Sequence, residues 1–263
     1  MKSNNVLVFF LSKIYIVIIN IIAYFKKTQI KNIPIIINNR NRLVFLNMLL
    51  NFLENKGYKN IIIIDNKSSY APLIDFYKTL PYRVILLEEN LGYKSLEKIP
   101  LYQEIRKNYF VYTDSDVVPI DECPDDFLEY FLQQLKKNFW VSKVGFSLKI
   151  DDLPDHYDKK EQVITWESQF FENKIGNDYI ATIDTTFALH KPYALISTRG
   201  FFKMIRTTYP YEARHMPWYN NSKSLSEEEQ FYIDHVEIGT HWSKGMELKE
   251  KKFLERLFDK FKN

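Results

Sequence analysis

Glycine is scarce in this chain. Only 7 of its 263 residues are glycine, whereas average usage would give roughly 18, and the two nearest in sequence are Gly239 and Gly245. The chain therefore has neither the G-x-G-x-x-G turn of dinucleotide-binding folds nor the G-x-x-x-x-G-K-[ST] loop of nucleoside triphosphatases. Any phosphate that this protein binds must be held by something other than the backbone amides of a glycine-rich loop.

The chain also lacks the means to cross-link itself. Its single cysteine, Cys123, excludes an internal disulfide, and its five histidines have no cysteine partners at the spacing of a structural zinc site. The fold must therefore be held by packing. A content of 46% hydrophobic residues, including 16% aromatics, is sufficient for a sizeable core.

Excess charge of one sign is absent from most of the chain. The formal net charge is +3 at pH 7, and the segment 244–263 alone holds seven Lys or Arg against four Asp or Glu, so the remainder is neutral. A general nucleic-acid binder needs a basic face on its folded body. We therefore do not expect nucleic acid as a partner.

One long hydrophobic run lies near the start of the chain. Residues 6–25 form an apolar stretch of 20 residues, about 30 Å long as a helix, and no small-residue cleavage site of a secretory signal follows it. Polar residues recur about every seven positions on one helix face: Asn5, Ser12 with Lys13, Asn20 and Lys27. Segment 1–30 is therefore predicted to be a helix that either associates with a membrane or packs on the following domain.

Segment 244–263 is predicted to be a basic amphipathic helix, a type that suits an anionic membrane surface. Its apolar residues recur at helical spacing between basic ones: Phe253, Leu254, Leu257, Phe258 and Phe261 among Lys251, Lys252, Arg256, Lys260 and Lys262. Lysines also follow the N-terminal run, which favours a cytoplasmic location for the domain after it. We expect a cytoplasmic protein that is peripheral to, or anchored in, a membrane.

The body of the chain, 31–243, alternates short β-rich runs with amphipathic segments. Strands are expected at 33–37, 61–64, 83–87 and 109–112, and helices at 43–55 and 70–79. Continuous Ile and Val runs are typical of parallel strands that are buried on both faces. The pattern predicts an α/β fold with a mostly parallel central sheet flanked by helices, in which ligands bind at the carboxyl ends of the strands.

Polar residues follow the expected strands, as turn chemistry alone would also require. The most specific of them are Asp114 and Asp116, two carboxylates at i and i+2 after the strand 109–112. Such a pair can bind one Mg²⁺ or Mn²⁺ while leaving positions open for phosphate oxygens. A metal held in this way could neutralise a diphosphate that no glycine-rich loop is present to bind.

These motifs resemble those of the nucleotide-sugar-dependent glycosyltransferases with the GT-A (Rossmann-like) fold, most closely family 2. The resemblance covers residues 33–120 and rests on four motifs in the expected order: Asn38-Asn39-Arg40, Asp65-Asn66-Lys67-Ser68, Asn90-Leu91-Gly92-Tyr93 and Asp114-Ser115-Asp116. It implies that 33–120 is the nucleotide-binding half and 121–243 the acceptor-binding half of one catalytic domain.

The resemblance also implies roles for individual residues. Asp65 would contact the nucleobase, and Asp114 would lie near the ribose and the metal, which Asp116 would hold directly. The remaining residues expected to contact the nucleotide sugar are Asn39, Arg40, Asn66, Asn90 and Gly92. The implied reaction is metal-dependent transfer of a sugar from a nucleotide-sugar donor to a glycan or a lipid-linked acceptor, with inversion at the anomeric carbon.

An inverting enzyme needs a carboxylate that takes the proton from the acceptor hydroxyl, and there are three candidates. Asp184 lies in the apolar run 183–189, where burial of an unpaired carboxylate would be costly, so a site role is expected. Glu228 and Glu229 open an expected helix and resemble the acidic motif of the family. Ser226 with Glu229 is also a capping box, so these acids can have a structural role instead.

Two histidines compete for a place beside the metal. His241 follows the acidic cluster in the order that the family implies, and His215 is the alternative. His215 also lies in the aromatic segment 209–219, where His215, Trp218 and Tyr219 could contact an acceptor sugar. Either histidine could instead be packed in the core.

Two other functions remain open at this stage. Asp114-Ser115-Asp116-Val117-Val118 also matches the motif of haloacid dehalogenase-like phosphatases, although that family places it after the opening strand, whereas three strands precede it here. A non-catalytic binding protein with a GT-A-like fold is the second alternative.

Overall fold

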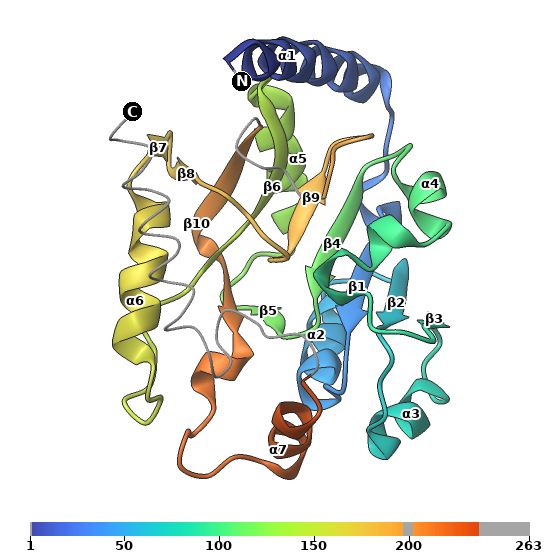
Figure 1. Cartoon of the computed structure of the whole chain (residues 1–263), viewed down its shortest axis with the longest axis vertical. Helices are drawn as coiled ribbons and strands as arrows, with labels where there is room; N and C mark the ends of the chain where they lie inside the picture. The colour runs from blue at the N-terminus through green and yellow to red at the C-terminus, as the bar shows by residue number, and fades with distance from the viewer. Residues whose placement is uncertain (1, 197–201, 237–263) are drawn as a thin grey trace.

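The computed structural model describes residues 2–196 and 202–236. It shows an α/β fold in which a central ten-stranded sheet is flanked by helices (Figure 1). Nine strands follow the order β3-β2-β1-β4-β9-β6-β10-β8-β7, and β5 pairs with β10 beside this path. The predicted fold class is confirmed.

The first four strands of this order form a parallel sheet. They are β1 (Ile35–Asn39), β2 (Ile61–Asp65), β3 (Arg83–Leu86) and β4 (Phe110–Asp114), paired as β1 with β2 and β4, and β2 with β3. Each of the four overlaps a strand expected from the sequence. Runs of Ile and Val suit these positions because side chains on both faces of the sheet are covered.

The second half of the sheet mixes directions. Strand β9 (Ala188–His190) lies antiparallel between β4 and β6 (Val141–Leu148), and β10 (Lys203–His215) runs parallel to β6. The edge is completed by β8 (Asp178–Ile180) and β7 (Lys174–Ile175), while β5 (Val117–Pro119) pairs antiparallel with the end of β10. This last pairing brings the end of β10 beside the Asp-Ser-Asp motif.

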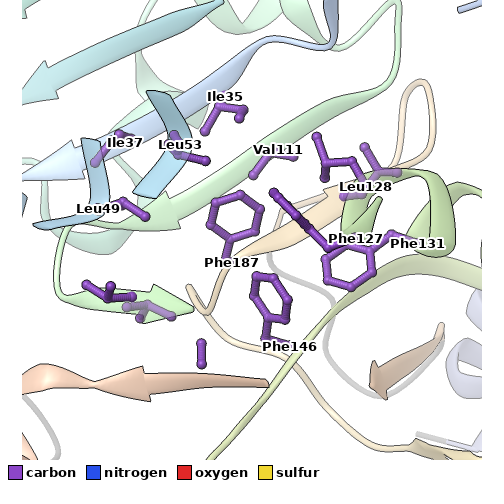
Figure 2. Close-up of a cluster of buried hydrophobic side chains, with 14 of the residues drawn as sticks. Ile35, Ile37, Leu49, Leu53, Val111, Phe127, Leu128, Phe131, Phe146 and Phe187 are labelled. Atoms are coloured by element: carbon purple, nitrogen blue, oxygen red, sulfur yellow. The ribbon is translucent and has the colours of Figure 1, made fainter. Parts of the chain in front are cut away.

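Helices cover both faces of the sheet. One face packs against α2 (Val44–Asn55), α3 (Ala71–Tyr77) and α5 (Phe127–Lys137), and the other face packs against α4 (Leu101–Ile105). Figure 2 shows the first core, where Phe127, Phe146 and Phe187 meet below Ile35 and Val111. Two further helices, α6 (Lys160–Ser168) and α7 (Glu227–Asp234), follow later in the chain.

Gly145 shows why one of the few glycines is required. It lies in β6 beside β9, where an added Cβ would come within 2.5 Å of the Phe187 carbonyl oxygen and 2.7 Å of the Ala188 Cβ. No larger residue fits there without moving the backbone, because both of these atoms belong to the packed centre of the sheet.

The N-terminal helix α1 (Lys2–Phe25) packs on the domain through one face. Ile16, Ile19 and Ala23 are buried on that face, and α1 lies across one end of the sheet (Figure 1). Asn20 is also buried, and its amide donates to the Phe139 carbonyl oxygen at 2.6 Å. Among the described residues, none of the helices combines the length and the hydropathy needed to cross a bilayer. The expected helix at 244–263 lies outside the described residues.

Candidate functional site

Three parallel strands end side by side at one edge of the sheet. The register pairs Asn38 at the end of β1 with Asp114 at the end of β4, and Asn39 with Asp65 at the end of β2. Successive side chains of a strand point to opposite faces of the sheet, so Asn38 and Asn39 contact different residues. Two polar groups result, one around Asp114 and one around Asp65.

Asp114 is held by hydrogen bonds to both of its carboxylate oxygens. Asn38 Nδ2 donates to Oδ1 at 3.1 Å, and the Thr185 hydroxyl donates to Oδ2. Ser95 in turn donates its hydroxyl to Asn38 Oδ1 at 2.8 Å, which fixes the orientation of the Asn38 amide. Burial and the neighbouring Asp116 carboxylate raise the pKa of Asp114 to about 7.

Asp116 lies between two basic side chains. Its Oδ2 is 3.6 Å from Arg42 Nε and 3.7 Å from His215 Nε2. His215 reaches this position because it ends β10 opposite Val117 of β5, directly after the motif. Burial lowers the pKa of His215, so its imidazole is neutral near pH 7 and has a lone pair available to a metal or a proton.

Arg42 also forms a buried ion pair with Glu229 of α7. Its Nη1 lies 2.5 Å from Glu229 Oε2 and its Nη2 lies 3.2 Å from Oε1, a bidentate arrangement. The guanidinium carbon lies 3.8 Å from the centroid of the Tyr232 ring. The pair joins the loop after β1 to α7, two segments that are far apart in the sequence.

Glu228 is also engaged in a structural contact. Both of its carboxylate oxygens accept from the Val44 backbone N–H at 3.1 Å, so Glu228 satisfies a free amide in the first turn of α2. The expected cap of α7 is present, because the Ser226 hydroxyl accepts from the Glu229 N–H at 3.2 Å. The two glutamates that the sequence proposed as bases therefore both have partners.

Asp184 differs from what its apolar surroundings suggested. Its side chain is exposed rather than buried, in the loop between β8 and β9. Only part of the run 183–189 is a strand, so the loop can turn Asp184 out while Ile183 and Phe187 remain in the core. Asp184 nevertheless lies close to the motif, since its charge adds to the rise in the pKa of Asp114.

The group around Asp65 is buried. The Tyr77 hydroxyl donates to Asp65 Oδ2 at 2.7 Å, and the Ser68 backbone N–H donates to Oδ1 at 2.8 Å. Asn39 Nδ2 donates to the same Tyr77 hydroxyl at 2.8 Å, while the Ser115 hydroxyl donates to Asn39 Oδ1 at 2.5 Å. Asn39 was expected to line the nucleotide pocket, but its side chain is buried and links the ends of the strands through Tyr77 and Ser115.

The other expected donor-binding residues lie in the loops that follow β1, β2 and β3. Asn66 Nδ2 donates to the Gly92 carbonyl oxygen at 3.0 Å, and Asn66 Oδ1 accepts from the Leu91 N–H at 2.7 Å. Asn90 Oδ1 accepts from the N–H of Gly92, whose φ of 71° suits a glycine. Arg40 donates to the Asn66 carbonyl oxygen at 2.9 Å and to that of His235, at the end of α7, at 3.2 Å.

Trp218 and Tyr219, which were expected to contact an acceptor sugar, make contacts within the domain instead. Trp218 is buried against His215, with ring centroids 4.7 Å apart, so it has no free face for a sugar. Tyr219 donates its hydroxyl to Asp152 Oδ1 at 2.5 Å. His215 is the residue of this group that reaches the motif. His241, the other candidate metal ligand, lies outside the described residues.

Some side chains of the site were not expected from the sequence. Asn38, Ser95 and Thr185 orient Asp114, and Arg42 lies against Asp116. The alternation of strand side chains could have identified Asn38, because Asn38 shares its face with Ile36 and not with Ile35 or Ile37. No local sequence pattern identifies Arg42, because its partner Glu229 is 187 positions away in the chain.

The carboxylates of Asp114 and Asp116 have the chemistry of ligands for a divalent metal ion. Asp114 and Asp116 supply oxygen ligands of the kind that Mg²⁺ and Mn²⁺ prefer, and burial followed by the nearby Asp116 charge raises the pKa of Asp114. Across residues 2–196 and 202–236, the structure contains no group of three His, Cys, Asp or Glu side chains placed to hold a metal ion. Two carboxylates fit an ion that is completed by substrate phosphates and water.

No protein-family model and no curated protein sequence matches this chain. Among solved structures, the chain is similar to glucosyl-3-phosphoglycerate synthase from Mycobacterium tuberculosis in complex with phosphoglyceric acid, with 9% sequence identity and a TM-score of 0.34. The similarity covers 61% of this chain and 57% of that chain, so it spans little more than half of that structure. A likeness of this strength says nothing about the reaction.

Proposed function

We propose that this protein is a metal-dependent glycosyltransferase that moves a sugar from a nucleotide-sugar donor to a glycan or a lipid-linked acceptor, with inversion. The observation that carries the proposal is the group at the end of β4. There, Asp114 and Asp116 lie side by side at the carboxyl edge of a parallel sheet, with Asn38 bonded to Asp114 and Asp184 nearby.

Asp114 and Asp116 are the residues that would hold Mn²⁺ or Mg²⁺, with the remaining positions left to substrate phosphates and water. Such an ion supplies Lewis-acid stabilisation of the negative charge on a departing nucleoside diphosphate. Asn38 and Thr185 keep the Asp114 carboxylate oriented, and Arg42 places its guanidinium 3.6 Å from Asp116. These contacts fix the carboxylates before substrate binds, which is how a charge-stabilising site gains its effect.

Asp184 is our choice for the general base. It is exposed and therefore accessible to an acceptor hydroxyl, and it lies close enough to Asp114 for its charge to raise the pKa of that carboxyl group. Glu228 and Glu229 suit the role less well, because one binds the backbone of α2 and the other binds Arg42. In this proposal the acceptor oxygen gives its proton to Asp184 as it forms the new bond to the anomeric carbon.

The nucleotide is proposed to bind over the ends of β1 and β2. Asp65 and Asn39 would support this surface from below, as part of the hydrogen-bonded group with Tyr77. The turn containing Asn90 and Gly92 would form its rim, held in place by Asn66. Arg40 would supply a positive charge beside these residues.

A donor-hydrolysis screen tests the proposal. The protein is incubated with uridine, guanosine, cytidine and thymidine diphosphate sugars in the presence and absence of Mn²⁺, and released nucleoside diphosphate is measured. We expect one donor class to be hydrolysed with Mn²⁺, and Asp116→Asn to abolish that hydrolysis. Asp75→Asn, an exposed acid of α3 paired only with Lys78, is the matched control.

Two results would contradict the proposal. Hydrolysis that is equal in the wild type and in Asp116→Asn would remove the motif from the reaction. Release of phosphate from p-nitrophenyl phosphate, without any release of nucleoside diphosphate from the sugars, would favour the phosphatase alternative.

A further inference from the structure

Two polar residues of α1, Lys13 and Asn20, contact the domain. Asn20, part of the polar stripe of the sequence, is buried and bonds on both sides: its Nδ2 donates to the Phe139 carbonyl oxygen, and its Oδ1 accepts from Lys191 Nζ at 2.7 Å. Lys13 lies 4.8 Å from the centroid of the Trp140 ring. Lys13 and Asn20 of the stripe therefore contact the domain, whereas Lys27, beyond the end of the helix, is exposed.

The opposite side of α1 is apolar and uncovered. Its residues recur at helical spacing and are between 48% and 76% exposed; this outward face of α1 consists of Leu11, Ile14, Ile18, Ile21 and Phe25. Figure 1 shows the helix lying along the outside of one end of the molecule, with no other described element beyond it. A row of this kind on a folded domain marks a contact surface.

The charges around α1 indicate what that surface contacts. Residues 2–25 contain no Asp or Glu, and Lys26 and Lys27 follow the last residue of the helix. Tyr24 of α1 is exposed, and so are Phe139 and Trp140, which contact Asn20 and Lys13 of the helix. Apolar residues, lysines and aromatics without acids match an anionic lipid surface, where basic groups meet phosphates and aromatic rings lie at headgroup level.

A second copy of the chain fits this surface less well. Pairing two outward faces would bring the lysines of both copies together without any acidic residue of α1 to neutralise them. The same charges are favourable against anionic headgroups. We infer that α1 lies flat on an anionic membrane, with its outward face in the headgroup and upper acyl region and its inner face on the domain.

This arrangement fixes which end of the domain meets the lipid. α1 contacts the starts of the strands, because Ala23 bonds to Tyr109 just before β4 and Asn20 bonds to Phe139 just before β6. The proposed site lies at the other ends of β1 and β4, roughly 17 Å away along five residues of strand. If the proposed transfer holds, its acceptor must extend away from the bilayer, as a growing glycan does.

Flotation of the full chain with vesicles tests the inference without depending on catalysis. Vesicles contain either phosphatidylcholine alone or equal parts of phosphatidylcholine and phosphatidylglycerol. We expect the protein to float with the anionic vesicles, and Ile18→Glu to lower its partitioning by on the order of tenfold. The matched control is Met48→Glu, an exposed apolar position on α2, which should float as the wild type does.

A second variant keeps the test independent of the fold of α1. The double substitution Lys26→Glu and Lys27→Glu alters only surface charge, and it should weaken flotation with anionic vesicles while leaving the thermal unfolding midpoint unchanged. The inference is overturned if Ile18→Glu floats as well as the wild type, since binding would then come from another segment such as 244–263. It is also overturned if the wild type does not float but dimerises and Ile18→Glu makes it monomeric.

Discussion

The buried ion pair between Arg42 and Glu229 gives the sharpest structural prediction. Arg42→Met removes the cation and leaves the Glu229 carboxylate 7% exposed without its partner. Breaking a buried pair in this way costs about 3–5 kcal/mol, and loss of the contact with the Tyr232 ring, 3.8 Å away, adds to it. Against a typical total of about 5–15 kcal/mol, this is a large fraction of the stability of the domain.

A double-mutant cycle measures the pair itself. Urea unfolding followed by circular dichroism should show that Arg42→Met with Glu229→Met is destabilised by clearly less than Arg42→Met alone, because the double variant no longer leaves the Glu229 carboxylate buried without its partner. Additive losses in the two single variants and the double variant would refute the reasoning, since they would mean that the two side chains do not interact.

A further variant of Glu229 tests whether this residue is the general base. Glu229→Gln keeps an oxygen acceptor for Arg42, so we expect a loss of stability, with donor hydrolysis in the folded fraction retained within about tenfold. If Glu229→Gln is as stable as the wild type but does not transfer sugar, then Glu229 acts in the chemistry and our structural interpretation of it is wrong.

Two further predictions concern Asp184 and His190. Asp184→Asn should lower transfer by about 10²–10⁴-fold with an unchanged unfolding midpoint, and unchanged transfer would exclude Asp184 as the base. Burial and the neighbouring Lys143 hold the pKa of His190 well below its ordinary value, so below about pH 6.5 the unfolded chain binds a proton that the folded chain does not. Stability therefore falls as pH falls, by about 1.4 kcal/mol per pH unit from this group, and His190→Phe should remove that part of the slope; parallel pH profiles for the two proteins would contradict it.

The first half of the fold could be predicted because its signals are local. Runs such as Ile61–Asp65 are too apolar for a surface strand, and the helix Val44–Asn55 between two of them carries its leucines at helical spacing. The polar residues at the strand ends then follow from the parallel arrangement alone. The second half could not be predicted in the same way, because β10 pairs with three strands from different parts of the chain, β5, β6 and β8.

The candidate site shows the same division at the level of single residues. The sequence pointed to Asp114 and Asp116, but it selected Asn39 where Asn38 is the residue bonded to Asp114. A shift of one position in a strand changes the face, and only the structure decides which face carries the site. Arg42 was missed because its role depends on Asp116, to which only the folded chain brings it.

The helix α1 is a further example. The sequence identified its polar stripe and left open whether the helix meets a membrane or the domain. The structure places Asn20 of that stripe against the domain, bonded to Lys191, and leaves the apolar side uncovered. Which face of a helix packs on the domain depends on the surface that the rest of the fold presents to the helix. The hydrophobic periodicity of the helix alone does not determine this.

Calorimetric titration with Mn²⁺ and nucleoside diphosphates tests the central claim most directly. The wild type should bind one nucleoside diphosphate far more tightly with Mn²⁺ than without it, and Asp116→Asn should lose this dependence while Asp75→Asn keeps it. Binding of no nucleoside diphosphate under any condition, or equal binding by the wild type and Asp116→Asn with and without Mn²⁺, would contradict the assignment of Asp114 and Asp116 as a metal-dependent nucleotide site.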